Sequence, residues 1–106
     1  MKHVCHAHNC NAPVPPRMLF CRPHWFSLRR AVQEAIWREY RPGQETDKRP
    51  SLRYMAVQRL AVSESAANEA ARKLFLVEAN LWRQRAIDAG LGDPLEGLVE
   101  EKRRVG

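Results

Sequence analysis

The sequence predicts an all-α protein, a small helical bundle preceded by an irregular N-terminal segment. Apolar residues recur at helical spacing from residue 28 onward. Residues 51–89 contain neither Pro nor Gly and are rich in the good helix formers Ala, Leu, Glu and Arg. The first 26 residues, in contrast, hold five residues that interrupt helices, Asn9, Asn11, Pro13, Pro15 and Pro16. At 106 residues the chain is long enough for one compact domain.

The irregular segment carries the spacing of a metal site: C-x4-C, ten residues, then C-x2-H, in Cys5, Cys10, Cys21 and His24. Each close pair supplies two corners of a tetrahedron, and the intervening loop folds one pair onto the other. Three cysteines would leave one thiol over in a disulfide framework, whereas with one imidazole they complete a zinc shell. We therefore predict a closed, structural Zn site. Its binding free energy would stabilise a segment that has too few apolar residues to form a core of its own.

Two alternatives to this ligand set stay open. His3, His6 or His8 could replace one of the first two cysteines or form a surface site. The three cysteines could also be free or buried, with incidental histidines nearby. A catalytic zinc would keep an open coordination position, and the chain has no H-E-x-x-H, G-x-S-x-G or phosphate-loop motif. We therefore expect a protein that is not an enzyme.

The elements after residue 26 follow from caps and periodicity. Ser27 is expected to cap a helix over 28–40, with Leu28, Val32, Ala35, Ile36 and Tyr40 on one apolar side. Residues 41–50 are polar and interrupted by Pro and Gly, which is typical of a loop. These features predict a Cys/His module over 1–45 and a helical part over 51–106, within a single compact domain.

The second part begins with the longest helical pattern in the chain. We expect it to start at Ser51 and to break or bend near residues 63–65, where a break would give two antiparallel helices. The alternative is a single helix, which would expose much of 74–82. Several of its residues keep heptad-like spacing, Leu60, Ala67, Ala70, Leu74, Val77 and Leu81. The run over 93–96, Asp-Pro-Leu-Glu, predicts a short capped helix after it.

The net charge of +6 is unevenly distributed. Residues 1–60 carry 11 basic and 4 acidic side chains, whereas residues 61–106 carry 7 basic and 8 acidic ones. The positive excess thus lies beside the metal motif, where its field attracts a polyanion.

Cations alternate with aromatic rings over residues 17–41, a pattern typical of proteins that bind single-stranded nucleic acid. The predicted nucleic-acid residues are Arg17, Arg22, Trp25, Arg29, Arg30, Trp37, Arg38 and Arg41. The alternative is that Trp25, Phe26 and Trp37 are core residues and that the arginines are only a solvated surface.

Two runs carry a resemblance to a known group: Val14-Pro15-Pro16-Arg17-Met18-Leu19-Phe20-Cys21-Arg22-Pro23-His24-Trp25-Phe26, and Tyr40-Arg41-Pro42-Gly43-Gln44-Glu45. With these motifs, residues 3–46 resemble small phage and prophage proteins of Proteobacteria that share a Cys/His opening, C-x2-H-W and Y-R-P-G-Q-E. The resemblance implies a phage origin and metal binding, and by analogy an anti-CRISPR role. This chain departs from the pattern at Arg29, usually Pro, and in its C-x4-C, which is often C-x2-C.

The resulting hypothesis is a phage accessory protein that binds nucleic acid, with single-stranded DNA favoured, and interferes with a host defence complex. The alternative is an inhibitor or adaptor that docks on a host protein through the apolar residues of 74–82. A homodimer formed by the long helices is compatible with either. The chain has no membrane span and no secretory signal, so we expect it in the host cytoplasm.

Overall fold

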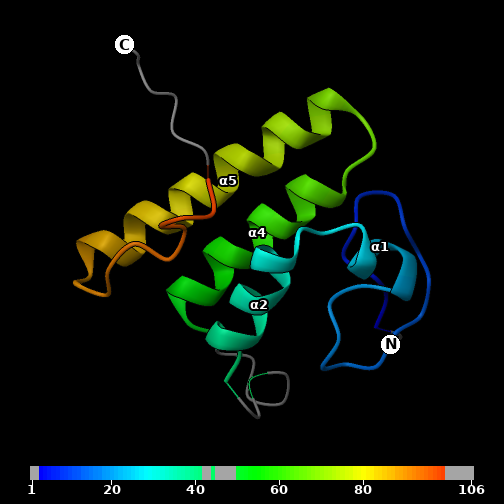
Figure 1. The fold of residues 1–106 in the computed structure, drawn as a ribbon, viewed down its shortest axis with the longest axis horizontal. Coiled ribbons are helices and arrows are strands. Elements are labelled where there is room, and N and C mark those ends of the chain that lie inside the picture. The colour runs from blue at the N-terminus through cyan, green and yellow to red at the C-terminus, as the bar shows by residue number, and fades with distance from the viewer. Residues whose placement is uncertain (1–2, 42–43, 45–49, 100–106) are drawn as a thin grey trace.

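The computed structural model describes residues 3–41, 44 and 50–99, and its regular elements are four helices (Figure 1). They are α1 (Arg22–Phe26), α2 (Arg30–Glu39), α4 (Leu52–Ser65) and α5 (Glu69–Asp88). Within the described ranges there is no regular strand, only an isolated antiparallel bridge between Val4 and Pro13. The predicted all-α bundle with an irregular N-terminal segment is confirmed.

The expected break in the long helical pattern is confirmed, and α4 and α5 run antiparallel (Figure 1). Capping side chains fix where both helices begin: Ser51 Oγ accepts a hydrogen bond from the Tyr54 amide at 3.0 Å, and Asn68 Oδ1 accepts one from the Ala71 amide at 2.8 Å. Between them the chain leaves the helical conformation, since Ala66 is extended with φ −71° and ψ 144°.

Helix α4 is the centre of the bundle, because it packs against α5 on one side and α2 on another. Its buried side chains therefore point in nearly every direction: Tyr54, Ala56, Val57, Leu60, Ala61 and Val62. On α5 the residues buried against this helix are small, Ala71, Ala79 and Ala86, which lets the two backbones approach closely. Several large apolar side chains of α5 are left outside this contact.

The predicted helix over 28–40 is wrong at its start. Helix α2 begins at Arg30, and Ser27 instead ends α1, where its hydroxyl donates to the His24 carbonyl at 2.6 Å. The reason is that the metal motif imposes its own short helix, so the chain must turn before α2 can start. The expected apolar side is confirmed, with Leu28, Val32, Ala35 and Ile36 buried.

The predicted last helix is also wrong. Residues 93–98 form consecutive turns, in which Asp93 Oδ1 accepts from the Leu95 amide at 2.9 Å and Leu98 N–H donates to Leu95 O at 2.9 Å. Gly97 has φ +81°, a conformation that ends a helix and suits glycine. Leu95 and Leu98 are nevertheless buried, because their side chains close the end of the core.

Arginine side chains connect segments that are distant in sequence. Arg53 on α4 bonds Glu39 on α2 at 2.8 Å and donates to the Leu91 carbonyl at 2.8 Å. Arg83 on α5 bonds Asp93 at 2.7 Å. The hydrogen bond from Arg53 lowers the pKa of the Glu39 carboxyl, and the one from Arg83 lowers the pKa of Asp93.

One cluster of buried residues includes members of both predicted parts, for example Phe20 and Val32 from the first and Val57 and Leu95 from the second. The division at residues 45–51 stays a prediction, since most of the expected 41–50 loop lies outside the described residues. None of the described helices is long and apolar enough to cross a membrane.

Candidate metal centre

Cys5 and Cys10 lie in a narrow loop held by backbone hydrogen bonds. The Cys5 amide donates to Ala12 O at 2.8 Å and the Val14 amide to His3 O at 3.0 Å, which brings the two arms of the loop together. At the tip, the Cys10 amide donates to Ala7 O at 3.1 Å. Asn9 has φ 64°, the left-handed conformation that Asn tolerates better than most residues. The turn allows both thiols to approach one point.

Cys21 and His24 come from the start of α1. Cys21 is the residue before the first turn of α1, and Pro23 within that turn has the backbone angle that suits a helix start. His24 therefore lies one turn after Cys21, on the same side of the helix. The His6 amide donates to Leu19 O at 2.8 Å, and this bond joins the loop of the first pair to the segment of the second.

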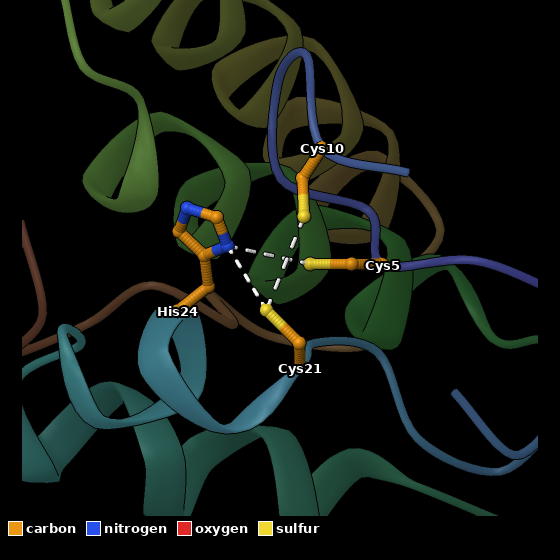
Figure 2. Close-up of side chains that lie close together, drawn as sticks. All are labelled: Cys5, Cys10, Cys21 and His24. Atoms are coloured by element: carbon orange, nitrogen blue, oxygen red, sulfur yellow. Dashed lines mark hydrogen bonds between the residues drawn. The ribbon is translucent and has the colours of Figure 1, made fainter. Parts of the chain in front are cut away.

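The four side chains converge on a single point, two from the N-terminal loop, one from the residue before α1 and one from α1 itself (Figure 2). His24 Nδ1 is 3.2 Å from Cys21 Sγ and 3.6 Å from Cys5 Sγ, and Cys10 Sγ is 3.9 Å from Cys21 Sγ. All four donor atoms lie within 4.8 Å of one another.

These distances can be compared with a tetrahedral zinc shell. Zn–S bonds of about 2.3 Å and a Zn–N bond of about 2.1 Å give ligand-to-ligand edges of roughly 3.6–3.8 Å. Three of the six separations, 3.2, 3.6 and 3.9 Å, lie around that value, and none of the six exceeds 4.8 Å. Three thiol sulfurs and one imidazole nitrogen are also the donor types that zinc prefers. The four residues thus fit a metal ion in both geometry and chemistry.

The surroundings shift the pKa values of the Cys5 and Cys10 thiols in opposite directions. Burial raises the pKa of the Cys5 thiol to about 11, although the Ala7 amide, whose nitrogen is 3.4 Å from its sulfur, donates a hydrogen bond that opposes this rise. A backbone hydrogen bond from Ala12 lowers the pKa of Cys10. A buried thiolate at Cys5 needs a nearby positive charge, which a bound divalent cation would supply.

The N-terminal histidines are not members of this cluster. The rings of His3 and His6 pack edge to face with centroids 5.3 Å apart, and His8 packs against Phe75 of α5 at 5.7 Å. The structure thus brings together the predicted set of four, and it places none of these three histidines among them.

A chain of aromatic rings connects the candidate metal centre to the bundle. Trp25, next to His24, meets Trp37 of α2 at 6.1 Å, Trp37 meets Tyr40 at 5.7 Å, and Tyr40 meets Tyr54 of α4 at 6.4 Å. Gln33 Nε2 also donates to Trp25 O at 2.8 Å. Packing of this kind fixes the orientation of α1 and hence of His24 and Cys21.

The predicted nucleic-acid residues are placed in different ways. Arg17 and Arg22 are exposed, and the Arg22 guanidinium lies over the Phe26 ring, 5.5 Å from its centroid. Trp25 is half-buried, whereas 48% of Trp37 and 66% of Phe26 are exposed, so the interpretation of Phe26 and Trp37 as core residues is wrong. Phe26 is not among the predicted nucleic-acid residues, although its position four residues after Arg22 was a usable signal.

The remaining four arginines have partners of their own. Arg30 forms an exposed pair with Glu34 at 3.4 Å, Arg38 pairs with Glu39 at 3.1 Å, and the Arg41 amide donates to Gln44 Oε1 at 3.0 Å. The Arg29 guanidinium bonds the Glu64 carboxylate at the end of α4 and donates to the Leu98 carbonyl at 2.6 Å.

Arg29 had no evident partner in the sequence because both of its partners are distant, 35 and 69 residues away. Its contacts give it a structural role, and a phosphate contact by Arg29 stays a prediction.

In comparisons with protein-family models, curated proteins and solved structures, nothing matches this chain.

Proposed function

We propose that this chain is a non-enzymatic nucleic-acid-binding protein whose N-terminal half is held by a zinc ion on Cys5, Cys10, Cys21 and His24. Zinc in this role supplies folding free energy and carries out no reaction. It would join the N-terminal loop to α1, the helix that carries part of the surface that we propose meets the nucleic acid.

We define that surface, the front surface, by five exposed residues: Arg17, Arg22, Phe26, Arg30 and Trp37. Arg30 and Trp37 lie seven residues apart, on the same side of α2 two turns from each other. Trp37 contacts Trp25 of α1, the helix that carries Arg22 and Phe26. Trp25 is half-buried beneath these contacts, and we therefore assign it a supporting role.

The observation that carries the proposal is the exposed ring of Phe26 with the Arg22 guanidinium over it, on the same helix whose Trp25 contacts the half-exposed Trp37. Exposed rings stack on unpaired bases, and adjacent guanidinium groups neutralise phosphates. Single-stranded nucleic acid offers both groups at once, whereas the bases of a duplex are stacked inside. We favour single-stranded DNA among such ligands, as the hypothesis from the sequence does.

The test is a fluorescence-anisotropy titration of the zinc-loaded protein with labelled single-stranded and duplex oligonucleotides over a range of salt. Three phosphate contacts by Arg17, Arg22 and Arg30 predict a slope of about −2 in a plot of log K against log salt for a single strand. Absence of binding to DNA or RNA at low salt would refute the proposal.

The chain offers a matched control. Arg22→Gln and Arg85→Gln each remove one positive charge, and each removes an arginine that lies over an aromatic ring, Phe26 in one case and Trp82 on α5 in the other. We expect only Arg22→Gln to weaken binding, with a salt slope smaller in magnitude by about 0.7. Equal losses in both variants would mean that the attraction is non-specific and that the front surface has no special role.

We further propose that the protein acts in the host cytoplasm as a phage accessory protein that interferes with a host defence complex of the CRISPR–Cas type. The support is the sequence resemblance together with a basic surface that could compete for the nucleic acid of such a complex. A plasmid-interference assay tests it: co-expression should restore plasmid establishment, and Arg22→Gln should reduce the effect.

A further inference from the structure

Helix α5 presents an uncovered apolar stripe. Leu74, Val77 and Leu81 are 55%, 57% and 60% exposed, and they lie on the side of α5 opposite the alanines that pack on α4. Ala70 extends the stripe by one turn toward the start of the helix, and it is exposed as well. Single exposed leucines are common on monomers, but three large apolar residues in consecutive turns are typical of an interface.

The spacing of the stripe is that of a coiled-coil seam. From Ala70 the steps are four, three and four residues, which is the alternation of heptad positions d, a, d and a. Toward the C-terminal end of α5 the same positions are polar, with Gln84 and Asp88. The apolar seam is thus short, about two heptads.

The charged residues beside the seam of one copy are complementary to those of a second copy. Lys73 and Glu78 occupy the flanking positions g and e, and in a parallel pair of helices each g side chain faces the e side chain five residues later in the other helix. Lys73 of one copy would face Glu78 of a second copy, and the reverse, giving two ion pairs around the centre of the seam. Lys73 is exposed, and 39% of the Glu78 side chain is exposed beside its intrachain partner Arg59, at 3.3 Å.

The opposite orientation does not bring the same charges together. In an antiparallel pair, equivalent flanks face each other. The register that keeps the apolar stripe together sets Leu74 against Val77 and Ala70 against Leu81, so Lys73 faces Asn80 and Glu78 faces Ala71, and no ion pair forms across the seam. The parallel orientation brings opposite charges together with the same apolar contacts.

We propose that two copies of this chain associate through their α5 helices, arranged in parallel, with Leu74, Val77 and Leu81 at the seam and reciprocal Lys73–Glu78 ion pairs beside it. Because α5 is already folded on α4, little ordering cost opposes this contact. The seam is nevertheless short, so association should be weak, with a dissociation constant in roughly the 1–100 μM range.

The arrangement has a geometric consequence. The contact of His8 with Phe75 places the N-terminal loop beside the first half of α5. A parallel pair would therefore carry both N-terminal loops toward the same end of the dimer. Each dimer would also carry two front surfaces, and a strand long enough to reach both would bind bivalently. This consequence rests on the proposed function, whereas the self-association does not.

Sedimentation velocity of the full zinc-loaded chain from 1 to 200 μM tests the proposal. We expect the wild type to shift from monomer to dimer with concentration, and Val77→Asp, at an exposed position, to stay monomeric while keeping its circular dichroism and zinc content. A wild type that is monomeric throughout, or a dimer that Val77→Asp leaves intact, would overturn the assignment of this face. Neither result depends on nucleic-acid binding.

Charge reversal tests the orientation. Lys73→Glu and Glu78→Lys should each weaken self-association about tenfold, since each makes both reciprocal pairs repulsive. An equimolar mixture of the two variants should recover wild-type affinity, because in the mixed dimer both pairs are again of opposite sign. Failure of the mixture to recover would overturn the parallel arrangement. Glu34→Lys is the control: it also breaks an intrachain Arg–Glu pair, at Arg30, and should leave association unchanged.

Discussion

Arg29→Ala should destabilise the whole fold, although Arg29 is more than half exposed. Its guanidinium joins the turn before α2 to Glu64 at the end of α4 and to the Leu98 carbonyl in the C-terminal turns. Truncation would leave the Glu64 carboxylate, whose side chain is only 18% exposed, and the Leu98 carbonyl without their common donor.

The expected loss follows from these contacts. The ion pair contributes about 0.5 kcal/mol after allowance for the exposure of Arg29, and the charged hydrogen bond to a half-buried carbonyl about 1–1.5 kcal/mol. A loss of about 1.5–2 kcal/mol corresponds to a fall in Tm of roughly 6–15 °C for a chain of this size. The assay is thermal unfolding followed by circular dichroism at 222 nm, with zinc in slight excess so that the metal is not limiting.

Arg30→Ala is the matched control, because Arg30 is the adjacent arginine and also bonds a glutamate. Its pair with Glu34 is fully on the surface, so its removal should cost at most about 0.5 kcal/mol. The double variant Arg29→Ala/Glu64→Ala should be less destabilised than the sum of its single variants. Equal Tm values for Arg29→Ala and Arg30→Ala would refute the reasoning that the contact of Arg29 with two distant segments stabilises the fold.

Further outcomes follow from the metal centre and from the buried ion pair. Purified protein should contain one zinc per chain by mass spectrometry, Cys21→Ser should contain much less, and zinc-free protein with an intact N-terminal loop would contradict the site. Chelation should increase hydrogen exchange over residues 3–26 well before residues 52–88, where caps and packing hold α4 and α5. Arg53 keeps the pKa of Glu39 below its ordinary value of 4.5, so this pair stabilises the fold above pH 4.5 and stops doing so as the pH falls through the lowered pKa. The difference in urea midpoint between wild type and Glu39→Gln should therefore shrink below pH 4.5, and a constant difference would show that the charge of Glu39 is not involved.

Much of this protein could be read from local sequence signals. The helix break near residue 65 was predictable because Ser, Glu and Ser interrupt an apolar pattern that is too long for one helix in a small domain. The cluster of Cys5, Cys10, Cys21 and His24 was predictable because metal-site chemistry restricts both the residue types and their spacing. The caps at Ser51 and the apolar side of α2 follow the same logic, since each depends only on residues within a turn or two.

The errors concern places where two local signals compete. Ser27 has the chemistry of a helix N-cap, yet the metal motif just before it forms α1, and Ser27 serves as the end of that helix instead. Asp93 and Glu96 have the spacing of a capping box, but Gly97 at positive φ ends the turn before a helix can propagate. Forming the first turn of a helix costs conformational free energy, and so short a segment adds too few hydrogen bonds to offset that cost.

What the sequence by itself determined is therefore the helical content, the four residues of the Cys/His cluster and the sign of the charge in the first half. Which arginines form ion pairs or hydrogen bonds within the fold was decided only by the tertiary structure. Arg29, for example, bonds Glu64 and Leu98, which are 35 and 69 residues away in the sequence. The same holds for the stripe on α5. Its heptad spacing is visible in the sequence, but the spacing does not say whether this side of the helix is buried. Because α4 packs against the alanines, Leu74, Val77 and Leu81 are left exposed. Local propensity acts over a few residues, whereas burial and ion pairing depend on which distant segments the folded chain brings together.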